Sequence, residues 1–238
     1  MELDENRLEK LAALLQELKI ESVSDFTHIN QALVHSSYLY EGNTAQSEHN
    51  QRLEFLGDAV VGLIIAHHLF ETFPKKPEGE LTKMRAAIVC EAALAEAARR
   101  IGLGEYLLMG KGEEQMGGKN RLSNLADCFE AFVGALYLTI DPEKTKGFVL
   151  DILQNKISAS ANGMYNDFKT HLQEFVQKKP DNRVTYRIIK EEGPDHAKVF
   201  YAAVFLNERE VAQGKGSTKK EAEQRAAKKA LKEFGELR

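Results

Sequence analysis

The spacing of apolar residues changes once along the chain, and this change constrains the fold more than any other feature of the 238 residues. Through about residue 155 the apolar side chains recur every three or four positions, a period that indicates helices. Over 184–190 and 200–206 they alternate, as in a strand with one buried face. The sequence therefore predicts an all-α part followed by a smaller α+β part.

The first part is expected to be a bundle of helices. Its first helix has a stripe of leucines at helical spacing: Leu8, Leu11, Leu14, Leu15 and Leu18. Further helices are predicted over 52–73, 81–101, 123–138 (capped by Ser123) and from Pro142 onward. The helix over 52–73 is apolar on nearly all sides, so we expect it to be buried. Small and polar residues over 158–163 predict a short linker.

The second part predicts the order α-β-β-β-α, in a segment long enough for one small core. Its elements are expected over 166–178, 184–190, 200–206, 210–213 and 218–234. The predicted domains are a helical domain over 7–141, a terminal helix and linker over 142–165, and the α-β-β-β-α domain over 166–236.

The composition excludes several classes of protein. With 43% hydrophobic and 29% charged residues, the chain is neither disordered nor fibrous. No apolar run reaches about 18 residues, and the acidic start has no apolar signal region, so we expect a cytoplasmic protein without a membrane span. The two cysteines, Cys90 and Cys128, lack metal-ligand spacing and suit a reducing compartment.

The net charge of −4 conceals a division between the two parts. Residues 1–160 carry 16 Lys and Arg against 24 Asp and Glu, whereas residues 161–238 carry 16 against 12. This division favours a polyanion bound by the second part and metal-dependent chemistry in the first. A solvated, charged helix would give the same composition.

Two predicted helices each carry a pair of carboxylates on one face. Glu54 and Asp58 are four residues apart, and Asp127 and Glu130 are three apart, in both cases among apolar neighbours. Like charges in such surroundings repel and lose solvation unless cations or hydrogen-bond donors neutralise them. Together the four acids would form an oxygen-rich site suited to Mg²⁺.

A structural alternative explains the same spacing. Arg52, Arg85 and Arg121 would neutralise the acids in buried ion pairs, which have the same appearance in a sequence. The spacing alone leaves both interpretations open.

Four stretches, in order along the chain, form a specific pattern. The longest is NQRLEFLGD at 50–58, and the others are ALVHSSY at 32–38, EGELTKMRA at 78–86 and LADCFEA at 125–131. The pattern resembles the ribonuclease III family, and the second part is similar to a double-stranded RNA-binding domain. The resemblance implies an all-α endonuclease domain followed by a small α+β (α-β-β-β-α) RNA-binding domain.

Carried over by position, the resemblance implies that Glu54, Asp127 and Glu130 bind metal directly. Asp58 completes the metal site by orienting water and ligands, and Asp58 and Glu130 are the expected catalytic residues. Glu78 matches a further acid with an auxiliary role. The implied cofactor is Mg²⁺, for which Mn²⁺ substitutes. The implied reaction is in-line hydrolysis of double-stranded RNA by two metal ions, giving 5′-phosphate ends and short 3′ overhangs.

Two positions depart from the family pattern. Gln51 stands where the family usually has Glu, which removes one charge beside the site. Phe168 replaces a usual Pro and is expected to alter only how the first helix of the second domain begins.

The resemblance of the second part depends on two loops. GPDH at 193–196 lies between the first two predicted strands, and GKGSTKK at 214–220 precedes the last helix, where Thr218 and Glu221 predict a capping box. By position, His196 would contact one minor groove of duplex RNA. Three polar residues of the first helix would contact the next minor groove: Thr170, Gln173 and Gln177. The phosphates between the grooves would be contacted by Lys215, Lys219 and Lys220. Taken singly, each is also an ordinary polar surface residue.

The resemblance further implies a homodimer that places two sites across one duplex and processes ribosomal RNA precursors and some messenger RNAs. The apolar stretches 52–73 and 129–137 are compatible with an isologous interface. Two other functions stay open: a duplex-RNA-binding dimer that does not cleave, and a helical metal-dependent nucleotide pyrophosphatase. The presence of all four acids disfavours the first, and the basic domain has no purpose in the second.

Overall fold

The computed structural model describes residues 3–21, 23–40, 48–161, 168–178, 182–194 and 198–236. The chain forms two compact units, Met1–Met164 and Tyr165–Arg238. The described elements of the first unit are helical: α1 (Glu5–Glu17), α2 (Thr27–Ala32), α3 (Ser36–Tyr40), α4 (Gln51–Thr72), α5 (Glu78–Ile88), α6 (Glu91–Arg100), α7 (Leu103–Tyr106), α8 (Lys111–Gln115), the 3₁₀ helix η1 (Gly118–Asn120), α9 (Leu122–Thr139) and α10 (Pro142–Ala161).

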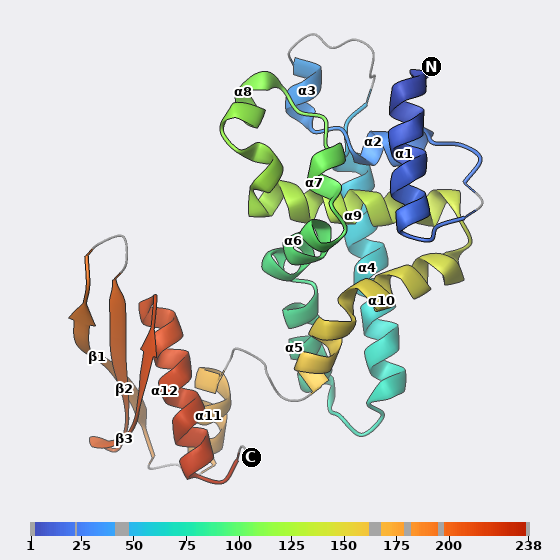
Figure 1. Ribbon diagram of the computed structural model, residues 1–238. Helices are drawn as coiled ribbons and strands as arrows, with labels where there is room; N and C mark the ends of the chain where they lie inside the picture. Colours follow the sequence, from blue (N-terminus) through green and yellow to red (C-terminus); the bar gives the residue numbers. More distant parts are fainter. Residues whose placement is uncertain are drawn as a thin grey trace. The chain divides into compact units, whose positions relative to one another are not determined.

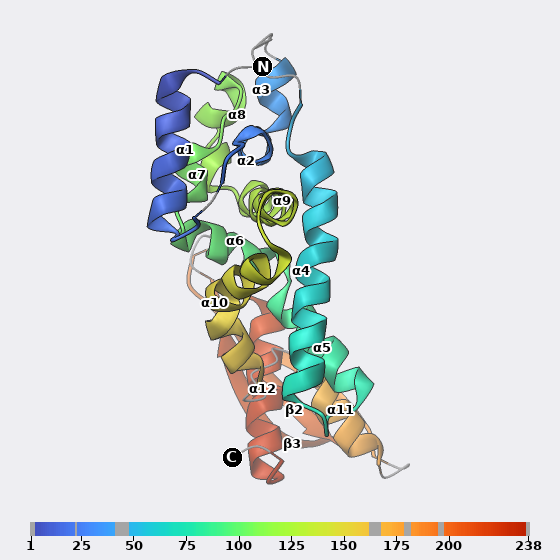
Figure 2. The same ribbon diagram turned by 90° about the vertical axis from the view of Figure 1, so that its right-hand side faces the viewer.

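Helix α9 forms the centre of the first unit. Figure 1 shows it crossing α4, and in Figure 2 it is seen end-on among α2, α4 and α6, all of which pack against it. The side chains of Phe129, Phe132 and Leu136 are fully buried. Most of this helix is apolar because neighbouring helices cover most of its sides, whereas Asp127 and Glu130 on it are half-buried.

Helix α4 is less buried than its sequence predicts. Its Ile65 and Leu69 lie in the core, but Phe55, Leu63 and Phe70 are 82%, 70% and 71% exposed. Among the described residues, α4 is the one helix long and apolar enough to cross a membrane, a test that core helices of soluble proteins also pass. The prediction of a buried helix is wrong because the neighbouring helices cover only one side of α4.

The predicted helix over 81–101 is two helices. Helix α5 ends at Ile88 and α6 begins at Glu91, with Cys90 in an extended conformation between them. The β-branched Ile88 and Val89 are weak helix formers, and the N-terminal end of α6 stabilises the carboxylate of Glu91. The break lets α5 pack on α4 and α10 while α6 packs on α9.

Two further boundaries differ from the prediction. Helix α9 begins at Leu122 without a side-chain cap, so Ser123 is not its capping residue. Residues 158–161, predicted as linker, belong to α10, because Ile157 and Ser160 are buried against the unit and packing prolongs the helix. The last two residues of the predicted linker lie outside the described residues.

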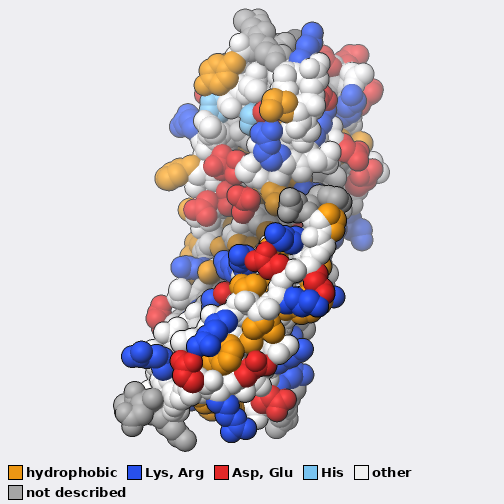
Figure 3. Space-filling view, turned by 90° about the vertical axis from the view of Figure 1, so that its left-hand side faces the viewer, with side chains coloured by type: hydrophobic (Ala, Val, Ile, Leu, Met, Phe, Trp, Pro, Cys, Tyr) orange, Lys and Arg blue, Asp and Glu red, His pale blue; other side chains and the backbone are white. Residues whose placement is uncertain are grey.

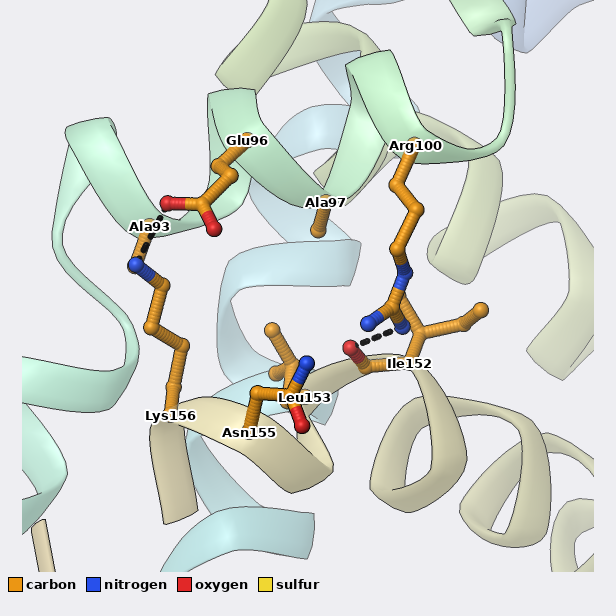
Figure 4. Close-up of a pocket in the computed structure, with 8 residues that line it drawn as sticks. All are labelled: Ala93, Glu96, Ala97, Arg100, Ile152, Leu153, Asn155 and Lys156. Atoms are coloured by element: carbon orange, nitrogen blue, oxygen red, sulfur yellow. Dashed lines mark hydrogen bonds and ion pairs between the residues drawn. The ribbon is translucent and has the colours of Figure 1, made fainter. Parts of the chain in front are cut away.

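Helix α10 is fixed to α6 by two long side chains (Figure 4). Arg100 of α6 donates a hydrogen bond to the backbone carbonyl of Ile152, and Lys156 of α10 forms an ion pair with Glu96. The cavity between them has a volume of about 20 Å³, enough for a water molecule but not for a substrate. These contacts therefore anchor α10 and do not form a binding site.

The second unit has the predicted order of elements: α11 (Phe168–Gln177), β1 (Val184–Glu192), β2 (Val199–Leu206), β3 (Arg209–Gly216) and α12 (Lys219–Glu233). The strands form an antiparallel sheet with β2 in the middle, and both helices cover one face of it (Figure 1). Leu172 of α11, Val204 of β2 and Leu231 of α12 are buried between these layers. The two periods in the sequence thus correspond to one helical unit and one mixed unit.

Candidate active site

Two glycines allow α4 and α9 to cross in backbone contact. A Cβ atom on Gly57 would lie 1.8 Å from the carbonyl oxygen of Glu130, and one on Gly134 would lie 2.4 Å from that of Leu53. A larger residue at either position would push the helices apart. The crossing therefore brings the first two turns of α4 within side-chain reach of Glu130 and its neighbours.

Three of the four predicted acids converge at this crossing. Glu54, Asp127 and Glu130 each place one carboxylate oxygen within 4.8 Å of the other two. We call these three residues the acid group. Asp58 lies one turn beyond Glu54, is exposed, and is not part of the group. Figure 3 shows acidic side chains gathered on one face of this unit. Three half-buried carboxylates fit a hard divalent cation such as Mg²⁺ or Mn²⁺.

Burial raises the pKa of all three carboxyls of the acid group, and repulsion by neighbouring acids raises it further. For Glu130 the pKa rises to about 7, first because of burial and then because of the charges of Asp58, Asp127 and Glu54. Burial also raises the pKa of Glu54, and it raises that of Asp127, where the charge of Glu91 adds to the effect. A bound cation would reverse this penalty, because it stabilises the ionised form of each carboxyl.

The ion pairs expected from the structural alternative are not found in the described part of the chain. Arg121 pairs with Glu113, at 2.5 Å between nitrogen and oxygen, and not with Asp127. Among the described residues, no ion pair joins Arg52 or Arg85 to the acid group. The geometry favours the metal site over the ion-pair network.

The sequence did not predict a hydrogen-bonded cluster that lies close to Asp127 at the start of α9. Glu113 of α8 accepts hydrogen bonds from Arg121 at 2.5 Å and from the side-chain amide of Asn124 at 2.9 Å. The buried Asn124 also donates to the carbonyl of Gly118. The cluster ties the loop before α9 to the first turn of that helix, just before Asp127. Its members come from separate elements, so no local pattern marks them.

Two other predicted positions lie outside the acid group. Glu78 is the first residue of α5 and accepts a hydrogen bond from the Thr82 hydroxyl at 2.8 Å. Gln51 begins α4 and lines a cavity of about 580 Å³ together with Phe55 and Leu138. None of the three acids lines this cavity. Gln51, which replaces the family's usual Glu, therefore lines this cavity and not the acid group.

The predicted RNA-contacting residues that the structure describes lie on α11, at the end of β3 and in the first turn of α12. Most are exposed, and Thr170 is half-buried: Thr170, Gln173, Gln177, Lys215, Lys219 and Lys220. His196 lies outside the described residues. The side chains of Gln173, Gln177 and the three lysines are therefore accessible from solvent.

The capping box at α12 is only half formed. The Thr218 hydroxyl accepts a hydrogen bond from the backbone N–H of Glu221 at 3.1 Å, as predicted. The Glu221 carboxylate bonds instead to the backbone N–H and the hydroxyl of Ser217, at 2.7 Å each. Lys219 and Lys220 still occupy the first turn of the helix, where the prediction placed them.

A helical unit with a group of carboxylates at a helix crossing, joined to a basic α-β-β-β-α unit, defines a class of metal-dependent enzymes that act on RNA. Comparison with known proteins narrows this class. Residues 25–157 match the Ribonuclease-III-like family, and residues 168–234 match the double-stranded RNA binding motif. The chain belongs to the ribonuclease III family and is an endoribonuclease with a double-stranded RNA-binding domain.

Individual relatives agree with this assignment. The chain is 52% identical over 205 residues to ribonuclease 3 of Syntrophomonas wolfei, covering 86% of this chain and 87% of that protein. It is 45% identical over 229 residues to ribonuclease 3 of Moorella thermoacetica, covering 96% and 97%. Among solved structures, the nuclease domain of ribonuclease III from Campylobacter jejuni matches with a TM-score of 0.55 and 39% identity, covering 61% of this chain and 96% of that domain.

Proposed function

We propose that this chain is an Mg²⁺-dependent endoribonuclease that hydrolyses both strands of duplex RNA and leaves 5′-phosphate ends with short 3′ overhangs. The observation that carries the proposal is the convergence of three carboxylates within 4.8 Å at the crossing of α4 and α9. Mn²⁺ is expected to substitute for Mg²⁺, because oxygen ligands suit both ions.

The residues of the site divide the task. Glu54, Asp127 and Glu130 would hold the metal, which supplies a water of lowered pKa and neutralises the charge on the leaving 3′ oxygen. Glu130 would release its proton as the cation binds, since burial, and then the neighbouring acids, raise its pKa to about 7. Asp58, exposed one turn further along α4, would orient water beside the group, and Glu78 would support it.

The second unit would position the duplex. Thr170, Gln173 and Gln177 would contact one minor groove and His196 another, while Lys215, Lys219 and Lys220 span the phosphates. Such contacts recognise the shape of A-form RNA and not its sequence, which accounts for selectivity toward duplexes. Binding should weaken steeply as salt concentration rises.

We also propose a homodimer formed through the exposed apolar side of α4. Phe55, Leu63 and Phe70 form this side, and Phe55 borders the cavity of about 580 Å³. Two copies related by a two-fold axis would bury these residues and present two acid groups to one duplex. Apart from its exposed end, α9 packs mainly within the core of its own unit, so it offers little surface to a second copy. The Campylobacter jejuni structure is described as having a region involved in dimer formation.

We propose the cytoplasm as the location, and ribosomal RNA precursors, with some messenger and transfer RNAs, as natural substrates. The support for both is membership of the family. Comparing transcript ends in cells with and without the protein would test the substrates.

Incubation with a labelled RNA duplex tests the enzymatic proposal. Mg²⁺ should produce cuts with 5′-phosphate ends, EDTA should prevent them, and matched single-stranded RNA should stay intact. A duplex that is retarded in a gel but uncut at every Mg²⁺ and Mn²⁺ concentration would instead identify a binding protein. The Glu130→Gln variant is the matched control for contaminating nuclease.

A further inference from the structure

One of the lysines assigned to RNA phosphates, Lys219, is already paired with a carboxylate of its own unit. Glu191, near the end of β1, lies 3.0 Å from the ammonium of Lys219 and 3.2 Å from that of Lys198. Its neighbour Glu192 points to the other side of the strand, where it pairs with Lys190. The end of β1 therefore presents one carboxylate to each side of the sheet.

The contact between Glu191 and Lys219 is exposed and specific. The Lys219 side chain is 59% exposed and the Glu191 side chain 34%. The ammonium of Lys219 also lies 5.6 Å from the ring centre of Phe200, the residue opposite Glu191 in the sheet. The two hydrogen bonds from Lys219 and Lys198 lower the pKa of Glu191, so this residue is an anion at neutral pH. A phosphate could reach the same ammonium from solvent.

A phosphate at Lys219 would meet Glu191 as a competitor. An ammonium has three donors, but a second anion bound to it would stand within a few ångströms of the carboxylate. The two negative charges repel, so either Glu191 gives up its contact or the phosphate binds less well. Both outcomes reduce the affinity for RNA.

We propose that Glu191 limits the affinity of the second unit for duplex RNA by competing with phosphate for Lys219. This inference rests on the RNA-binding function proposed above. Binding then exchanges one anion for another on a lysine that is already positioned. A weaker complex also lets the enzyme release cleaved duplexes sooner.

The test compares Glu191→Gln with Glu208→Gln in the full-length chain. Glu208 lies at the opposite end of the sheet and pairs with Arg187 at 2.6 Å, so its replacement removes the same charge away from the assigned lysines. Binding to an RNA duplex longer than about 16 base pairs is measured in EDTA, which prevents cleavage, over a range of salt concentrations. Lys219→Gln and the Glu191→Gln/Lys219→Gln double variant complete the set.

Glu191→Gln should bind about threefold to tenfold more tightly, with a steeper dependence on salt, and Glu208→Gln within about twofold of the unchanged chain. The gain should vanish when Lys219 is also replaced. If Glu191→Gln and Glu208→Gln bind the duplex more tightly by the same factor, the change in net charge explains the effect. If Glu191→Gln binds the duplex more weakly, Glu191 positions Lys219 for RNA. Either result overturns the competition.

The Lys219→Gln variant distinguishes a failure of this proposal from a failure of the RNA-binding function on which it rests. If that variant binds duplex normally, the assigned RNA surface is wrong. If it binds less well while Glu191→Gln is unchanged, the RNA surface stands and only the competition fails.

Discussion

The acid group of the helical unit and the start of α12 in the second unit differ in how their charges are neutralised. In the helical unit three carboxylates crowd at one crossing, and none forms an ion pair with a described residue. In the second unit Lys219, at the start of α12, and Lys198, before β2, both pair with Glu191, and Figure 3 shows basic and acidic side chains side by side over this unit. Unpaired like charges indicate a site for a cation, because a bound cation would offset their repulsion. Paired charges indicate a surface that exchanges partners.

Removing one carboxylate of the acid group should give the largest effect. Glu130→Gln is expected to lower the cleavage rate about a thousandfold or more, because a ligand of the metal is lost. Duplex binding in EDTA should change by less than about twofold, since the lysines are untouched. Cleavage rates and binding are measured on the same duplex. Near-normal cleavage would show that the acid group is not the active site.

The second prediction concerns the crossing of α4 and α9, which positions the acid group. Gly57→Ala should destabilise the fold by about 3 kcal/mol and reduce cleavage, because its Cβ would collide with the backbone of Glu130. Gly147→Ala in α10 has nothing within 4 Å of the added carbon and should stabilise by about 0.5–1 kcal/mol. Unfolding in urea gives both values. Equal effects would mean that the crossing does not determine the spacing of the acids.

The two units should also differ in how stability depends on pH. The folded-state pKa of Glu130 is about 7, above the ordinary 4.5, so without metal its contribution favours folding at low pH and is lost as pH rises from 4.5 to 7. In the second unit partners lower the pKa of Glu191 and Glu221, so their contribution is lost as pH falls below about 4.5.

Hydrogen exchange of peptides from each unit, in EDTA at several pH values, measures this difference. Protection of the α4–α9 peptides should decrease between pH 5 and about 7, and Glu130→Gln should flatten that decrease. The same trend in both units would argue that net charge, and not the acid group, is responsible.

The smallest effect is expected at Gln51. Gln51→Glu restores the usual charge of the family but should change the Mg²⁺ concentration for half-maximal cleavage by less than about threefold, because Gln51 lines the cavity beside Phe55. Glu54→Gln, a change within the acid group, should raise that concentration more than about tenfold. A tenfold decrease for Gln51→Glu would place this position in the ion site.

The helical spacing and the family motifs were sufficient to predict the two units and to single out Glu54, Asp127 and Glu130, which the structure brings together, whereas Asp58, predicted with them, lies outside the acid group. Local sequence patterns do not predict that Glu54 lies close to Asp127 and Glu130, because this contact depends on which helices cross. The close contact between Gly57 and Glu130 joins residues far apart in the chain, and nothing near Gly57 in the sequence marks it. The same is true of Lys219 and Glu191, which lie on different elements.

The errors in the sequence analysis have a common origin in packing. The helix over 81–101 breaks at Cys90 because its two halves pack on different partners. The helix ending at Ala161 continues into the predicted linker because Ser160 is buried. Apolar periodicity locates a helix, but it does not show which side is left uncovered, and so the exposed Phe55 was unexpected.

The backbone contact between Gly57 and Glu130 also has a consequence for the proposed ion site when its ion is removed. The spacing of the acids is fixed by two packed main chains, so it exists before a cation arrives. Small zinc domains, in contrast, unfold when their metal is chelated. Here ions would enter and leave a folded molecule, and the active fraction of the enzyme would follow the concentration of free Mg²⁺ without a refolding step.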